Sequence, residues 1–164
     1  MDRINTDSIA DILILGIGNV LMGDEGFGVH FARRMENEDL PRGVAVLEGG
    51  TAGMQLMEAI ESHRYVLLVD ATLDNRPPGT VREIKPRFSS DYPAAMSTHD
   101  IGLKDLISGL TFLGKLPEIY LFVVSVAELQ PMYIGLSPEV EVALAAVKEK
   151  IRNRINQLRE EEGS

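Results

Sequence analysis

The sequence predicts an α/β fold in which a mostly parallel sheet is covered by helices on both faces. Continuous apolar runs of strand length alternate along the chain with segments of helical periodicity. Only nine residues, Ala71 to Gly79, separate the third and fourth runs. A parallel crossover needs about a dozen residues or more, so the fourth strand is expected to be antiparallel. The 164 residues show no repeat or linker, and we expect a single domain over 1–164.

Each element follows from the pattern of its own segment. The predicted strands are Asp11 to Ile17, Val44 to Glu48, Tyr65 to Asp70, Thr80 to Lys85 and Glu118 to Val126. The helices fit Gly26 to Glu38, Gly53 to Ser62, Gly102 to Leu113 and Ser137 to about Glu160. One apolar stripe runs along the last helix through Val140, Leu144, Val147, Ile151, Ile155 and Leu158. Such a stripe usually faces the core, so we expect this helix to dock on the sheet, with a partner-binding helix as the alternative.

Composition narrows the classes of function. The formal net charge of −9 argues against sequence-independent binding of nucleic acid, which depends on Lys and Arg at phosphates. The absence of cysteine excludes disulfides, thiolate metal sites and a cysteine nucleophile. No apolar run is long enough to span a membrane, and the first run lacks the basic flank and cleavage site of a signal peptide. The expectation is a cytoplasmic protein with neither a nucleic acid nor a membrane as partner.

The loop after the first strand carries two adjacent acids, Asp24 and Glu25, in a glycine-rich setting. Glycines at a strand end let the backbone approach a ligand closely, and a following helix N-terminus suits an anion. Two carboxylates at this point favour a cation or a proton instead. For either acid alone, capping of the following helix is an equally simple interpretation.

Other polar residues follow the remaining strands and extend the candidate site. In open α/β sheets, ligands gather outside the carboxyl ends of the strands. Asp70 ends the third strand, and His99 precedes the third helix, so Glu25, Asp70 and His99 could converge at one rim. Two carboxylates and an imidazole suit Ni²⁺, Zn²⁺ or Fe²⁺ and leave positions open for water or substrate. Turn and helix capping are the alternative roles for Asp70 and His99.

Familiar catalytic and nucleotide-binding motifs are missing. The sequence has no HExxH pair, no GxSxG elbow and no Walker loop. The dinucleotide fingerprint is half present, because Gly16 and Gly18 match but its third glycine falls at Leu21. Asp24 and Glu25 would also repel a pyrophosphate at this point. Nucleotide binding is therefore the weaker hypothesis.

Five motifs, in order, carry a resemblance to a known family. The segments GIGNVLMGDEGFGV, EGGTAGMQLM, VLLVDA, STHDIGL and PMYIGLSP lie between about Ile12 and Lys150. Together they resemble the hydrogenase maturation endopeptidases, the nickel-dependent proteases that process the large subunit of [NiFe] hydrogenases. The resemblance implies a three-layer αβα sandwich with a five-stranded twisted sheet. It also implies that metal-contacting positions fall on Glu25, Asp70 and His99.

Further positions follow from the same resemblance. Asp24 and the turn Gly49, Gly50, Thr51 match other family motif positions, and we assign Asp24 a catalytic role and the turn a substrate-binding role. Glu48 stands where many family members have Asp.

The implied reaction is removal of a short C-terminal extension from the [NiFe] hydrogenase large-subunit precursor once nickel is in place. The nickel would be supplied by this substrate. Hydrolysis could use a metal-polarised carbonyl or metal-activated water, or a carboxylate such as Asp24 as general base. The competing hypotheses are a non-catalytic nickel-checking chaperone and, more distantly, a nucleotide-binding α/β enzyme.

Overall fold

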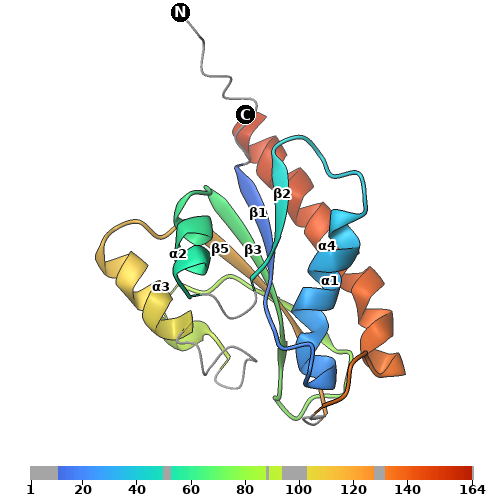
Figure 1. The fold of residues 1–164 in the computed structure, drawn as a ribbon. Coiled ribbons are helices and arrows are strands. Elements are labelled where there is room, and N and C mark those ends of the chain that lie inside the picture. Colours follow the sequence, from blue (N-terminus) through green and yellow to red (C-terminus); the bar gives the residue numbers. More distant parts are fainter. Residues whose placement is uncertain (1–10, 50–52, 88, 94–102, 128–131, 164) are drawn as a thin grey trace, which may run out of the picture.

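Five strands form one sheet in the order β2-β1-β3-β5-β4 (Figure 1). The computed structural model describes residues 11–49, 53–87, 89–93, 103–127 and 132–163. The strands are β1 (Ile12–Gly16), β2 (Val44–Glu48), β3 (Tyr65–Thr72), β4 (Val81–Ile84) and β5 (Glu118–Ser125). β4 pairs antiparallel with β5 and every other pairing is parallel, which confirms the prediction from the short third connection.

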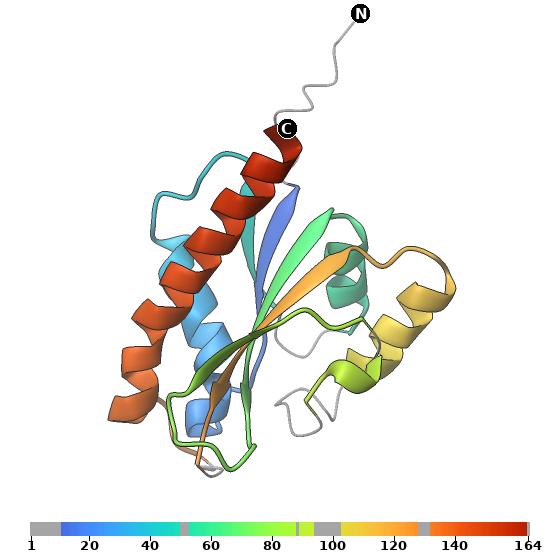
Figure 2. The ribbon, with the colours of Figure 1, turned by 180° about the vertical axis from the view of Figure 1, so that it is seen from behind.

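Helices cover both faces of the sheet, so the predicted three-layer αβα arrangement is confirmed. The helices are α1 (Phe27–Glu36), α2 (Gly53–Glu61), α3 (Leu103–Phe112) and α4 (Pro138–Gly163), with short 3₁₀ turns η2 (Gly23–Gly26) and η3 (Ser89–Asp91). Figures 1 and 2 show α1 and α4 on one face and α2 and α3 on the other. Within the described ranges, no helix combines the length and the apolar character needed to cross a membrane.

Alternation of side chains along the strands builds a core on each face. In β1, Ile12 and Ile14 pack in the cluster that contains α1 and α4, whereas Leu13 and Leu15 pack with α2 and α3. The central strands are buried on both faces, which explains why they read as continuous apolar runs. The predicted stripe of α4 is buried in the first of these clusters, so docking on the sheet is confirmed for this helix.

The edge strand β4 is short and carries charged residues. Arg82 pairs with Asp74 at 3.0 Å, and Glu83 accepts a hydrogen bond from Nε of Arg154 in α4 at 2.7 Å. These pairs fix β4 against its neighbours from both faces of the sheet. Short, charged edges are a common feature of strands that must not recruit another chain.

The first turn of α1 packs backbone to backbone against the end of β1 and against Val69 of β3. A Cβ atom on Gly28 would overlap the carbonyl oxygens of Ile17 and Val69, and one on Gly16 would overlap the carbonyl oxygen of Gly28. Only glycine allows this approach. The close packing fixes where the chain between β1 and α1 must run.

Substitution of Gly28 by alanine should therefore destabilise the fold, although alanine favours helix formation. We expect Gly28→Ala to lower the free energy of unfolding by about 2–3 kcal/mol, because the added methyl group forces the helix off the sheet. Gly109 is the matched control, since it also lies within a helix but has open space where its Cβ would stand. Gly109→Ala should raise the free energy by about 0.5–1 kcal/mol. Urea denaturation of both variants measures the difference, and equal changes would contradict the close packing.

Candidate functional site

The carboxyl ends of the parallel strands meet at one edge of the sheet (Figure 1). Gly16 at the end of β1 pairs with Glu48 of β2 on one side and with Val69 of β3 on the other. Asp70 is the next residue of β3, and the loop that carries Glu25 leaves from the end of β1. The structure thus brings Glu25 and Asp70 to the same edge, as the sequence predicts.

The loop between β1 and α1 holds the backbone of Glu25 from both sides. The Glu25 N–H donates to the Met22 carbonyl, and the Glu25 carbonyl accepts from the Asn19 N–H, each at 3.3 Å. Gly18 has a φ of +152° and lies so close to Glu25 that a Cβ would overlap the Glu25 carbonyl oxygen. The side chain of Glu25 is half-buried at the mouth of this loop.

Asp24 is buried and holds the start of α4. Its side chain is 4% exposed. Oδ1 accepts the backbone N–H of Ser137 and Oδ2 accepts the Ser137 hydroxyl, both at 2.7 Å. Ser137 stands immediately before α4, so the carboxylate lies near the positive end of that helix dipole. Such charge-assisted hydrogen bonds are about twice as strong as neutral ones.

Asp70 is fully buried and lies two residues before the end of β3. By strand alternation it shares a face with Val66 and Leu68, which pack against α2 and α3. The third predicted ligand, His99, lies outside the described residues. Within the described ranges, which omit it, no group of three His, Asp or Glu side chains is arranged to hold a metal ion. The predicted roles of Glu25, Asp70 and His99 stay predictions.

The predicted substrate-binding turn is described only in part. Gly49 is buried, and its N–H donates to the Gly16 carbonyl at 2.8 Å, which ties the end of β2 to the end of β1. Gly50 and Thr51 lie outside the described residues.

Glu48 turns toward α1 and away from Asp70. Its two carboxylate oxygens accept Nε and Nη2 of Arg33 at 2.9 and 3.0 Å. Along β2, Glu48 alternates with Leu47 and shares a face with Val44 and Val46, which pack in the cluster of α1 and α4. The side chain of Glu48, which is longer than that of aspartate, is therefore held by a bidentate ion pair with Arg33.

His30 and His63 are both half-buried. Nε2 of His30 is enclosed and has no hydrogen-bond partner within the described part of the chain. Burial lowers the pKa of His30 and the nearby Arg33 lowers it further, which favours the neutral imidazole. Neither histidine lies among the predicted ligands.

Two further residues border the site and were not predicted from the sequence: Ser137, which holds Asp24, and Tyr133, which bridges to Met22 in the loop that carries Glu25. Both belong to the motif PMYIGLSP, for which no role was predicted. A serine followed by proline at the start of a helix is a typical N-cap signal. That signal locates Ser137 at a helix start but does not reveal its partner, because Asp24 is 113 residues away in sequence.

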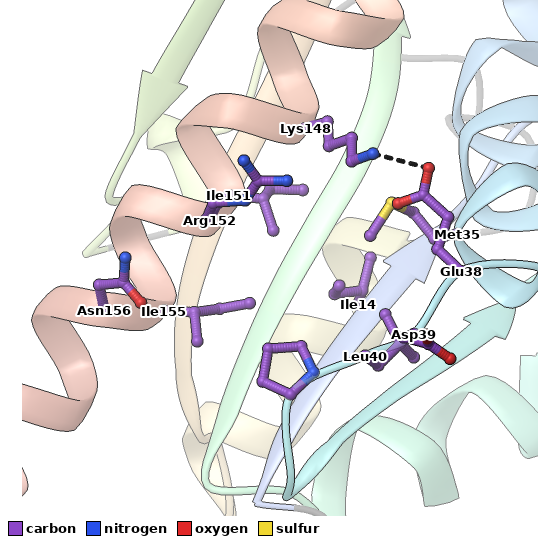
Figure 3. Close-up of a pocket in the computed structure, with 11 residues that line it drawn as sticks. Ile14, Met35, Glu38, Asp39, Leu40, Lys148, Ile151, Arg152, Ile155 and Asn156 are labelled. Atoms are coloured by element: carbon purple, nitrogen blue, oxygen red, sulfur yellow. Dashed lines mark hydrogen bonds and ion pairs between the residues drawn. The ribbon is translucent and has the colours of Figure 1, made fainter.

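A small hollow lies between α1 and α4, away from this edge (Figure 3). Its volume is about 120 Å³, its floor is apolar, and Lys148 pairs with Glu38 across its rim at 2.6 Å. The hollow includes Leu40 and Pro41, which lead into β2, so it belongs to the amino end of the strands. It is not part of the candidate site.

Comparisons with known proteins agree on one family. A family model described as hydrogenase maturation protease matches residues 29–154. The hydrogenase 2 maturation protease of Escherichia coli strain K12 is 34% identical over 146 residues, covering 85% of this chain and 87% of that protein. The solved structure of the hydrogenase maturating endopeptidase HybD from E. coli has a TM-score of 0.77 at 33% identity, covering 89% and 92% of the two chains. That of the [NiFe] hydrogenase maturation protease HybD from Thermococcus kodakarensis has a TM-score of 0.71 at 27% identity, covering 87% and 97%.

The contact between Asp24 and Ser137 should contribute measurably to stability. Asp24→Ala removes both acceptors, and we expect the free energy of unfolding to fall by about 2–3 kcal/mol. Ser137→Ala removes only the hydroxyl donor and should cost about 1 kcal/mol. The double variant should cost less than the sum of the two, because each single variant already breaks the same interaction.

Urea denaturation followed by circular dichroism gives all three values. Asp39→Ala, at an exposed position after α1, serves as the control and should stay within about 0.5 kcal/mol of the parent protein. Strict additivity of the Asp24 and Ser137 changes would show that the two side chains do not support each other.

Proposed function

This chain belongs to the hydrogenase maturation protease family, and we propose that it is the endopeptidase that removes the C-terminal extension of a [NiFe] hydrogenase large-subunit precursor. Membership of the family makes it a hydrolase. The observation that supports the finer proposal is that the loop carrying Glu25 leaves β1 at the same end of the sheet at which Asp70 lies in β3, where open α/β folds bind their ligands.

We propose that these two carboxylates, together with His99, contact the nickel carried by the precursor. A mixed set of oxygen and nitrogen donors suits this ion. Three protein ligands leave coordination positions open for groups of the substrate itself. Because Asp70 is fully buried, its attraction for a cation would act in a medium of lower dielectric than water and would be strengthened accordingly. Nickel is then part of the substrate, and its presence indicates that the precursor is ready to be cut.

The contacts of Asp24 favour a positioning role over that of general base. A general base must come within hydrogen-bond reach of the attacking water. Asp24 is buried, and both of its oxygens already accept hydrogen bonds from Ser137. We infer that Asp24 fixes the loop on which Glu25 lies, and that hydrolysis proceeds by the metal-assisted route, in which the cation polarises the scissile carbonyl or activates the water.

A loss of the proposed ligands should abolish processing without unfolding the protein. Glu25→Gln keeps the size of the side chain and removes its charge, and His99→Ala removes the imidazole. Each should slow cleavage of nickel-loaded precursor by at least about 10–100-fold, which is the loss caused by removal of even an outer-shell partner in metal sites. Intact-mass analysis of the precursor follows the cut.

Glu58→Gln is the matched control, because Glu58 is an exposed acid on α2, outside the site. It should process the precursor at the parent rate. Circular dichroism confirms that each variant is folded. A normal rate for Glu25→Gln would mean that Glu25 is only a structural acid of the loop.

The nickel content of the precursor should decide whether it is cut. Purified protein incubated with nickel-loaded precursor should shorten it, whereas nickel-free precursor should keep its full mass, since the open ligand set is completed only by the incoming metal. Equal cleavage of the two would rule out nickel recognition. Binding without any cleavage of the loaded form would instead support the non-catalytic checking protein.

A further inference from the structure

Exposed apolar side chains gather on two loops at the same edge as Glu25. Leu21 belongs to the loop between β1 and α1, and three consecutive residues precede α4, namely Met132, Tyr133 and Ile134. Their exposed fractions are 49%, 85%, 52% and 70% in that order. We call these four side chains the apolar strip. Large apolar side chains grouped in this way on a protein surface mark sites of interaction.

Backbone hydrogen bonds join the two loops. Tyr133 forms a parallel bridge with Met22. Its N–H donates to the Leu21 carbonyl at 3.2 Å, and its carbonyl accepts the Gly23 N–H at 2.8 Å. The two segments of the apolar strip therefore form one hydrogen-bonded unit, although Leu21 and Met132 lie more than 100 residues apart in the sequence.

The conformation of Met132 indicates that this unit is held in a set shape. Its φ of +61° is rare for a residue other than glycine. Such a conformation persists only where the surroundings impose it, and it occurs preferentially at functional sites. The side chain held in this way is also the most exposed of the four. A surface fixed before binding loses less conformational entropy when a partner docks.

The apolar strip is tied directly to the loop that carries the proposed nickel ligand. Met22, which bridges to Tyr133, also accepts the N–H of Glu25. At the other end of the strip, Ser137 holds Asp24, the neighbour of Glu25. A protein segment bound to the strip would consequently be held at a constant distance from Glu25.

We propose that the apolar strip docks an apolar segment of the large-subunit precursor and so places the precursor's nickel at Glu25. The inference rests on the proposed function. The strip is continuous with the proposed site through hydrogen bonds, and its four members are uncharged in a chain whose net charge is −9, which favours an apolar rather than an ionic contact. A second copy of this chain seated on the strip would cover the edge that the substrate must reach, so the precursor is the better occupant.

The test uses a variant that removes two side chains without disturbing the backbone. Glycine adopts the φ of Met132 at no steric cost, and Ile134 is largely exposed, so Met132→Gly/Ile134→Ser should fold normally. Phe112→Ser is the matched control, since Phe112 is 91% exposed at the end of α3 and lies outside the strip. Thermal unfolding verifies that both are as stable as the parent protein.

Steady-state cleavage of nickel-loaded precursor supplies the first measurement. For the double variant, KM should rise about tenfold or more, as for loss of anchoring residues at an interface, while kcat changes less than about twofold. Phe112→Ser should keep both values. An unchanged KM for the double variant, with active parent protein, would overturn the docking inference and leave the proposed function intact.

Binding without cleavage supplies the second measurement. Glu25→Gln protein is immobilised with and without the two strip substitutions, and nickel-loaded precursor is passed over each surface. Binding that is weaker by at least about fivefold on the substituted surface supports docking, whether or not cleavage is observed. A lack of cleavage would count against the proposed function alone. Equal binding on both surfaces overturns the inference. A third result would also overturn the inference: the parent protein self-associates, the strip substitutions abolish this self-association, and KM stays unchanged.

Discussion

The contact between α1 and the sheet is the constraint on which the rest of the site depends. Because the first turn of α1 touches the backbone at the end of β1 and at Val69 of β3, glycine is required at Gly16 and Gly28. The chain between them must then turn sharply outward and back, which it does through Gly18 and η2. Glu25 lies in that turn. Its position at the edge of the sheet thus follows from how closely a helix is allowed to approach two strands, before any metal or substrate is considered.

The fold was predictable from the sequence because its signals are local. Both faces of β3 and β5 are buried, so these strands read as predominantly apolar runs, and the eight residues between β3 and β4 are too few for a parallel crossover. Observed strand ends lie within two residues of the predicted ones; β2 matches at both ends, and the largest difference is at Thr72, which extends β3 beyond Asp70. The long helix α4 was predictable because its apolar residues recur at helical spacing and form one stripe, which is buried against the sheet.

Parts of the site were not predictable because their contacts are distant in sequence. Nothing near Asp24 indicates that its carboxylate meets Ser137, and nothing near Glu48 indicates that Arg33 holds it. The first pair requires the start of α4 to lie beside the loop that carries Asp24, and the second requires α1 to lie beside the end of β2. The direction of each acid is also a property of the assembled sheet: Asp70 turns toward the layer of α2 and α3, whereas Glu48 turns toward α1. Two acids that lie near the carboxyl ends of their strands therefore have separate surroundings.

The edge strand β4 has a consequence for how a flexible peptide tail can be recognised. Many proteins capture an extended segment by adding it to the open side of a sheet, where main-chain hydrogen bonds hold any sequence of suitable shape. Here that side is four residues long, and its charged side chains are engaged by Asp74 on one face and Arg154 on the other. Strand addition at β4 would offer few main-chain bonds. A peptide tail bound along this edge strand would therefore have to be selected by its side chains and its shape, since main-chain pairing there contributes little.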